Sequence, residues 1–122
     1  MPFRLKLKAQ LYCGDQIAMG PGKANLLDAI NRTGSISAAG RELGMSYRRS
    51  WLLVDTMNKS WREPLVTTVV GGRSGATLSS LGHEVLTAYR ALERELENVA
   101  SSAAAKRLRA ALEKDKDVIG LE

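Results

Sequence analysis

Three consecutive side chains, Tyr47, Arg48 and Arg49, carry the most distinctive chemistry of this sequence. A guanidinium group donates several hydrogen bonds in a planar fork, which suits phosphate oxygens and the O6 and N7 atoms of guanine. A tyrosine beside them offers a hydroxyl for a phosphate, or a ring for a thymine methyl group. The three residues follow Ser46, a good helix N-cap, so we expect them in the first turn of a helix. Such a turn is suited to contact with a polyanion.

Residues that support catalysis or metal binding are scarce. His83 is the only histidine and Cys13 the only cysteine, and no carboxylate motif or metal-ligand spacing accompanies them. The glycines at 71–75 lack the Gly-Lys-Ser/Thr ending of a phosphate-binding P-loop. We therefore expect no enzymatic activity, no metal and no cofactor. A single cysteine also excludes an intrachain disulfide.

The basic turn belongs to a helix-turn-helix pattern over residues 34–61. Gly44 is predicted to take the positive φ that ends the first helix, and Ser46 to cap the second. Ser35 or Ser37 is predicted to cap the first helix. Small residues one turn before the glycine would let the two helices pack closely, namely Ala39 and Gly40. In this motif the second helix lies in the major groove of DNA.

An apolar stripe in the second helix predicts its buried face. Trp51, Val54 and Met57 or Asn58 recur at steps of three and four residues. Trp51 and Trp61 are therefore predicted to lie in the core or at an interface, with Trp51 on the inner stripe beside Val54. The opposite face carries the basic residues.

The flanking segments predict the supporting elements. Residues 3–12 alternate apolar and polar side chains, which is typical of a strand with one buried face. Leu26, Leu27 and Ile30 indicate the inner face of a helix at 22–33, closed by Gly34.

A second pair of strands is predicted after Pro64. Residues 65–70 are rich in β-branched side chains, and 76–78 form a short return strand. The intervening glycine-rich tip contains Arg73 and Ser74, and we interpret it as a wing that reaches the DNA backbone or minor groove. A hairpin tip without a partner is the alternative.

A long amphipathic helix is predicted next, from residue 81 to 105. Its apolar stripe exceeds what a small domain needs for its own core, so we expect the first half to pack inside and the second half to form a dimer seam. The dimer-interface residues predicted on this helix are Leu81, Val85, Leu86, Tyr89, Leu92, Leu96 and Val99. Residues 101–105 are expected either to hinge or to continue the helix.

The charge distribution supports contact with nucleic acid. The chain of 122 residues has a formal net charge of +5. Residues 1–81 carry 11 Lys and Arg against 5 Asp and Glu, whereas residues 82–122 carry 7 against 8. The basic excess therefore accompanies the helix-turn-helix. The lack of an export or transmembrane segment predicts a cytoplasmic protein, associated with the bacterial nucleoid and not with a membrane.

These patterns predict a mainly α fold with small β elements. We expect a winged helix-turn-helix domain with an N-terminal strand at 1–80, a dimerisation helix at 81–105 and a charged tail at 106–122.

The chain resembles the N-terminal DNA-binding domain of the ModE family of molybdate-responsive regulators, which share their plan with LysR-type regulators. The resemblance covers about residues 3–100. It rests on Leu5-Lys6-Leu7, on Gly34-Ser35-Ile36-Ser37-Ala38-Ala39, on Met45-Ser46-Tyr47-Arg48 with Ser50-Trp51, on Met57-Asn58, on Val70-Gly71-Gly72 with Gly75, and on Thr77-Leu78-Ser79 with Gly82.

The resemblance implies a dimer that binds palindromic promoters. It also implies a C-terminal domain for molybdate or tungstate, which is expected to be missing here because the sequence stops at Glu122. A free-standing regulator, a sensor supplied elsewhere and a structural role on DNA all stay open, and the effector is unknown.

The residues expected to contact DNA are Ser35, Ser37, Ser46, Tyr47, Arg48, Arg49, Lys59, Arg73 and Ser74, with Lys23 as a further backbone contact. The alternative functions are an architectural DNA-binding protein and a winged helix that binds protein.

Overall fold

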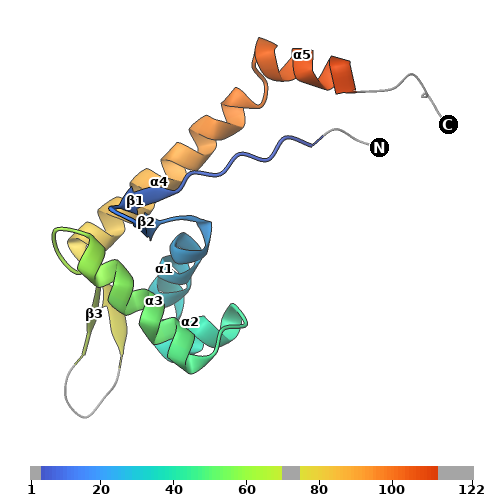
Figure 1. The fold of residues 1–122 in the computed structure, drawn as a ribbon. Coiled ribbons are helices and arrows are strands. Elements are labelled where there is room, and N and C mark those ends of the chain that lie inside the picture. The colour runs from blue at the N-terminus through green and yellow to red at the C-terminus, as the bar shows by residue number, and fades with distance from the viewer. Residues whose placement is uncertain (1–3, 70–74, 113–122) are drawn as a thin grey trace.

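A computed structural model describes residues 4–69 and 75–112 of the chain. Figure 1 shows the elements in their spatial arrangement. In chain order they are β1 (Leu11–Cys13), β2 (Gln16–Met19), α1 (Pro21–Thr33), α2 (Ile36–Glu42), α3 (Tyr47–Ser60), β3 (Val66–Thr68), β4 (Ala76–Leu78), α4 (Ser80–Val99) and α5 (Ala103–Leu112).

The described strands form two antiparallel hairpins. β1 pairs with β2, with Tyr12 opposite Ile17, and β3 pairs with β4, with Thr67 opposite Thr77. Gly14 takes a φ of 61° in the first turn, a conformation that favours glycine. The predicted class, mainly helical with small β elements, is confirmed.

The predicted N-terminal strand is much shorter than expected. Only Leu11–Cys13 is a strand, and residues 4–10, which we call the N-terminal arm, run alongside α4 without joining a sheet. The partner strand has four residues, so it cannot pair with more of the segment. Leu5 and Leu7 are 37% and 40% exposed, because no second layer covers the alternating apolar side chains.

The helix-turn-helix prediction is correct at its turns. Pro21 begins α1, and Gly34 ends it with a φ of 72°. The Ser35 hydroxyl accepts a hydrogen bond from the Ala38 amide at 3.1 Å, so Ser35 is the N-cap of α2. Gly44 has the predicted positive φ, also 72°, between α2 and α3.

The contact between α2 and α3 depends on Gly40. A Cβ atom at this position would lie 1.9 Å from the Oγ atom of Ser50, which is fully buried. The Ser50 hydroxyl donates a hydrogen bond to the Ser46 carbonyl at 2.9 Å and so has a partner. The expected role of small residues at this contact is confirmed.

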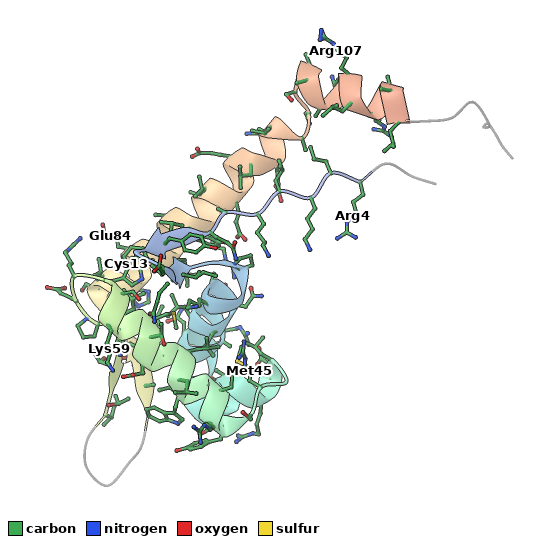
Figure 2. All side chains as sticks on the ribbon, in the orientation of Figure 1. Arg4, Cys13, Met45, Lys59, Glu84 and Arg107 are labelled. Carbon is green, nitrogen blue, oxygen red and sulfur yellow. The ribbon has the colours of Figure 1, made fainter. Side chains whose placement is uncertain are left out.

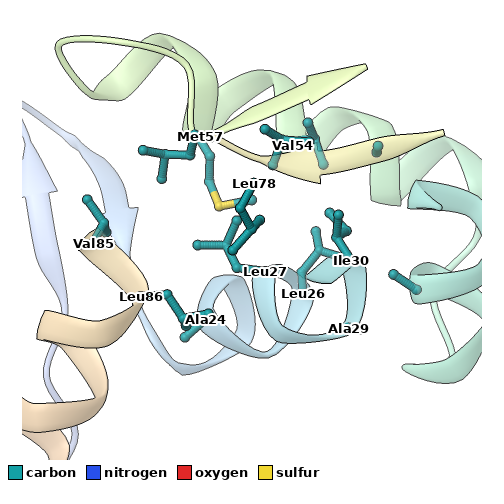
Figure 3. Packing of buried hydrophobic residues seen from close by; sticks show 14 of the residues in the cluster. Ala24, Leu26, Leu27, Ala29, Ile30, Val54, Met57, Leu78, Val85 and Leu86 are labelled. Atoms are coloured by element: carbon teal, nitrogen blue, oxygen red, sulfur yellow. The ribbon is translucent and has the colours of Figure 1, made fainter. Parts of the chain in front are cut away.

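The hydrophobic core forms around α1. Figure 3 shows side chains of α3, β4 and α4 converging on Leu27 and Ile30, which are fully buried. The residues contributed by those three elements include Val54, Met57, Leu78, Val85 and Leu86. This core holds α3 at a fixed orientation relative to the second hairpin.

Asn58 joins α3 to β3. Its side-chain oxygen accepts hydrogen bonds from the amides of Leu65 and Val66 at 2.9 and 3.0 Å, and its side-chain nitrogen donates to the Val66 carbonyl. These bonds satisfy backbone groups of the bend that follows α3. The helix ends at Ser60, with Trp61 in an extended conformation before Pro64.

The long helix predicted to residue 105 is two helices. α4 ends at Val99, residues 100–102 form a break, and α5 begins at Ala103, near the Ser102 hydroxyl that accepts from the Ala105 amide. No helix among the described residues is long and apolar enough to cross a membrane.

Two groups of bonds connect α4 with the rest of the domain. The Tyr89 hydroxyl donates to the Ala9 carbonyl at 2.8 Å and holds the N-terminal arm. The Arg90 guanidinium pairs with Asp28 of α1 and donates to Asn25 at 3.0 Å, and it also pairs with Glu93 of its own helix. The sequence motifs contained no signal for this cluster.

Candidate nucleic-acid interface

The first turn of α3 has a capped backbone and exposed side chains. The Ser46 hydroxyl accepts a hydrogen bond from the Arg49 amide at 3.1 Å, which confirms Ser46 as the N-cap. Tyr47, Arg48 and Arg49 are all exposed, and Tyr47 is 67% accessible. Core packing beneath the turn orients the helix while these side chains stay available to a ligand.

Arg48 and Arg49 lie on different sides of α3. Neither Arg48 nor Arg49 forms an ion pair with another described residue. Successive helical residues are separated by about 100°, and Arg49 lies on the side that faces α1, where its charge acts on Lys23. We call Tyr47, Arg48, Arg49 and Trp51 the recognition surface.

The prediction that Trp51 lies on the inner stripe of α3 with Val54 is wrong. Its side chain is 39% exposed and packs against Tyr47, with ring centroids 6.1 Å apart. Val54 and Met57 are buried as predicted, and the third buried position of α3 is Ser50. Because Gly40 approaches α3 so closely, the inward position beside it accepts a serine but has no room for an indole. Trp51 therefore belongs to the outer face.

Trp61 occupies the environment predicted for it. The indole is half-buried against the core, and its Nε1 atom donates to the Ala18 carbonyl at 3.1 Å. This contact joins the end of α3 to β2.

The serines predicted as phosphate contacts differ in their availability. Ser46 is exposed, whereas Ser35 and Ser37 are half-buried at the start of α2. The hydroxyls of Ser35 and Ser46 already cap their helices. A phosphate at either helix start would meet the backbone amides together with a hydroxyl engaged on one side.

Lys59 lies far from the basic turn. Figure 2 shows it near the opposite end of α3 from Met45, which precedes the first turn. Its ammonium group forms an ion pair with the Asp55 carboxylate at 2.9 Å, and both groups are exposed. A phosphate would have to compete with Asp55 for this lysine.

The second hairpin lies at one end of α3, but its tip is outside the described residues. Arg73 and Ser74, the residues predicted for the wing, belong to that tip. The described strands are held by a hydrogen bond between the Val69 amide and the Gly75 carbonyl at 2.9 Å, and the Ala76 amide donates to the Gly34 carbonyl. The end of the described hairpin nearest to its tip therefore contacts the end of α1.

The sequence contains one cysteine and one histidine. Cys13 and His83 are both exposed. Within residues 4–69 and 75–112, no three His, Cys, Asp or Glu side chains converge to form a metal site.

Lys6 and Lys8 were missed as ligand-binding candidates. Together with Lys23 and Arg49 they line a groove beside the recognition surface. Their alternation with leucines predicts a strand and does not by itself indicate a binding role. The available signal was the run of three cations, Arg4, Lys6 and Lys8, without an acidic residue among them.

Comparison with known proteins gives clear sequence relatives. The chain is 44% identical over 86 residues to the molybdenum-pterin-binding protein MopB of Rhodobacter capsulatus, a match that covers 69% of this chain and 32% of the relative. It is 41% identical over 83 residues to the molybdenum transport protein ModE of Azotobacter vinelandii, covering 66% and 31%. The DNA-binding transcriptional dual regulator ModE of Escherichia coli is 31% identical over 87 residues, covering 70% and 31%.

The chain thus spans about a third of the length of the curated relatives that it matches. No family model matches it. The relation to ModE proteins that the sequence motifs indicated is confirmed over the matched part of the chain.

Proposed function

We propose that this chain is a DNA-binding transcriptional regulator connected with molybdenum metabolism, and that it acts as a homodimer on a palindromic promoter site in the bacterial cytoplasm. The observation that carries the proposal is the recognition surface, where two arginines without an ion-pair partner among the described residues lie exposed on a rigidly held helix. The names of the relatives include a DNA-binding transcriptional regulator and molybdenum proteins. They support the regulatory role and the connection with molybdenum.

The recognition surface would lie in the major groove. There Arg48 and Arg49 would donate to guanine O6 and N7, and the aromatic pair would contact thymine methyl groups. Arg73 and Ser74, predicted from the sequence as wing residues, would contact the minor groove or the adjacent backbone. Lys59 would add a phosphate contact at the far end of α3.

The dimer would form through the second half of α4. Leu92 and Val99 are 37% and 49% exposed, and Leu96 is half-buried. The other four residues predicted for the seam, Leu81, Val85, Leu86 and Tyr89, are buried in the chain's own core. The part of α4 left for a second copy is therefore the part that extends beyond α1 (Figure 1).

The proposal is tested by selecting bound fragments from genomic DNA, followed by footprinting at physiological salt. We expect protection of an inverted repeat, with half-sites about 34 Å or a multiple of that apart, near genes of molybdenum metabolism. Protection without a repeat would indicate an architectural protein.

The roles within the recognition surface are tested by single substitutions. Arg48→Ala and Arg49→Ala should each weaken specific binding by about 1–3 kcal/mol and non-specific binding much less. Lys59→Ala should weaken both alike and only slightly. Equal losses for all three variants would mean that the arginines contact phosphate alone.

A protein-binding role is the second candidate, because apolar side chains are exposed on α3. Trp51 and Leu52 are 39% and 54% exposed. The absence of any salt-dependent retention on DNA would favour this role.

A further inference from the structure

A basic groove lies beside the recognition surface. Its walls are the N-terminal arm, the start of α1 and one side of α3. Lys6, Lys8, Lys23 and Arg49 line it, and no acidic side chain is found among its described lining residues. We use the name basic groove for the surface around these four cations.

The start of α1 adds further positive potential to the basic groove. Its N-cap, Gly20, provides no side-chain hydrogen bond, and the first turn contains no acidic residue. The N-terminal end of a helix carries a partial positive charge that favours anions. Lys23 occupies this first turn, where a cation is the less favourable choice for the free protein.

The electrostatic environment of Lys23 agrees with this geometry. Partial burial lowers the pKa of Lys23, and the nearby positive charge of Arg49 lowers it further. Like charges are therefore held together at some cost in the absence of a ligand.

The cations of the basic groove lack the acidic partners that other cations have. Within the described parts of the chain, ion pairs engage Arg32, Lys59, Arg62 and Arg90. None of these pairs involves Lys6, Lys8 or Lys23. Glu93 and Glu97 lie across the arm, on its α4 side, where they line a separate groove with Arg4 and Lys6.

The arm has a spacing suited to a polymer of phosphates. It runs as an extended segment away from β1 (Figure 1), so residues two positions apart are separated by about 7 Å. Lys6 and Lys8 can therefore engage separate phosphate groups. Arg49 connects the basic groove to the recognition surface, because it lines the first and belongs to the first turn of α3.

We propose that the basic groove binds the phosphodiester backbone of DNA next to the major groove occupied by α3, and that Lys6, Lys8 and Lys23 anchor the protein there without reading bases. The inference rests on the proposed function. A free oxyanion shares the same chemistry and is the alternative occupant.

The test compares two triple variants of the full chain on a selected DNA site. K6Q/K8Q/K23Q removes three charges from the basic groove, whereas the control R94Q/K106Q/R107Q removes three exposed charges from α4 and α5. Each lost phosphate contact reduces the slope of log K against log salt by about 0.9. We expect the groove variant to lose about 2–3 from this slope and the control less than 1, with K6R/K8R/K23R restoring it.

A second measurement locates the contact. Neutral methylphosphonates placed singly along the backbone should weaken binding of the unmodified protein at a few positions that no longer matter to the groove variant. Equal slopes for the groove variant and the control would overturn the inference.

A titration with inorganic phosphate, followed by NMR, distinguishes the alternative occupant. If it shifts the amides of Gly22 and Lys23 while the groove variant binds DNA as the unmodified protein does, the groove holds a free anion and the inference is overturned. If the unmodified protein itself fails to bind any DNA, it is the proposed function that has failed.

Discussion

Single residues of α3 differ in role according to the side of the helix on which they lie. One side packs in the core and another is exposed, so adjacent residues can have opposite environments. Trp51 and Ser50 are neighbours, yet Ser50 is fully buried against Gly40 while Trp51 lies beside Tyr47. An exposed aromatic pair next to two arginines is suited to contact apolar groups at the edges of bases.

Replacing Trp51 with alanine should therefore cost little stability. Loss of one exposed aromatic contact is worth about 0.5–1.5 kcal/mol, whereas Met57→Ala, which empties a fully buried site, should cost about 2–5 kcal/mol. Chemical denaturation of both variants checks this. A loss of stability above about 3 kcal/mol for Trp51→Ala would mean that the indole is buried in the core after all. On DNA, Trp51→Ala should also reduce the preference for thymine over deoxyuridine in the selected site.

Gly82 lies where the start of α4 closely approaches the backbone of Leu65, the residue before β3. A Cβ atom there would lie 2.2 Å from the Leu65 carbonyl oxygen, which already accepts a hydrogen bond from the Ser79 amide. Because backbone atoms cannot move aside cheaply, Gly82→Ala should destabilise the domain by about 1–3 kcal/mol.

Gly22→Ala is the matched control for this change. It is also near the start of a helix, and a Cβ atom there would meet nothing within 4 Å. The alanine should be neutral or stabilise by up to about 1 kcal/mol. Equal thermal shifts for the two variants would contradict the packing argument.

Among the elements, the N-terminal arm is held by few contacts with the rest of the domain. Its apolar side chains stay partly exposed, and its clearest polar anchor is the Tyr89 hydroxyl. The arm also forms one wall of the basic groove, so its position bears on ligand binding.

Tyr89→Phe should loosen the arm and leave the helical core folded. Loss of one hydrogen bond costs about 0.5–1.5 kcal/mol. Faster amide exchange at residues 5–10, with unchanged exchange in α1 and α3, is the expected result. Uniformly faster exchange would mean that Tyr89 supports the whole domain instead.

The same hydroxyl predicts a dependence on alkaline pH. Burial raises the pKa of Tyr89 above its ordinary value near 10. A raised pKa means that the stabilisation is complete below that ordinary value and is lost as the pH rises through the folded-state pKa. The arm should therefore be released at strongly alkaline pH in the unmodified protein. Tyr89→Phe should show no such transition in exchange at Ala9.

The molecule as a whole consists of a packed domain and a projecting part formed by the end of α4 and by α5. The first half of α4, as far as Tyr89, packs in the core, but its second half and α5 project away from it (Figures 1 and 2). Leu108 and Leu112 of α5 are each 66% exposed. An apolar surface of this kind is suited to burial against another chain.

We expect a homodimer in solution that is broken by charges on this surface. Leu92→Glu with Val99→Glu should raise the dimer dissociation constant at least tenfold. Thr87→Glu with Asn98→Glu places the same charges at exposed polar positions and should have little effect. Sedimentation at micromolar concentration measures this, and a monomeric unmodified protein on and off DNA would exclude the dimer.

Local chemistry explains what could be predicted from the sequence. Helix caps at Ser35 and Ser46 and the positive φ at Gly34 and Gly44 depend on neighbours within a few positions. These signals determine the turns of the helix-turn-helix, and therefore that residues 47–49 begin a helix. The exposed basic turn follows from them.

Only the tertiary structure decided which alternating or periodic residues had a partner. The strand that pairs with the N-terminal segment has only four residues, so most of this segment lies outside the sheet as an arm. Lys6 and Lys8 of the arm line one groove with Lys23 and Arg49. Because α2 approaches α3 closely at Gly40, Ser50 is the buried residue there and Trp51 is exposed. Apolar periodicity marks a face to be covered, but the element that covers it is determined by packing between distant segments, because burial depends on their arrangement in space.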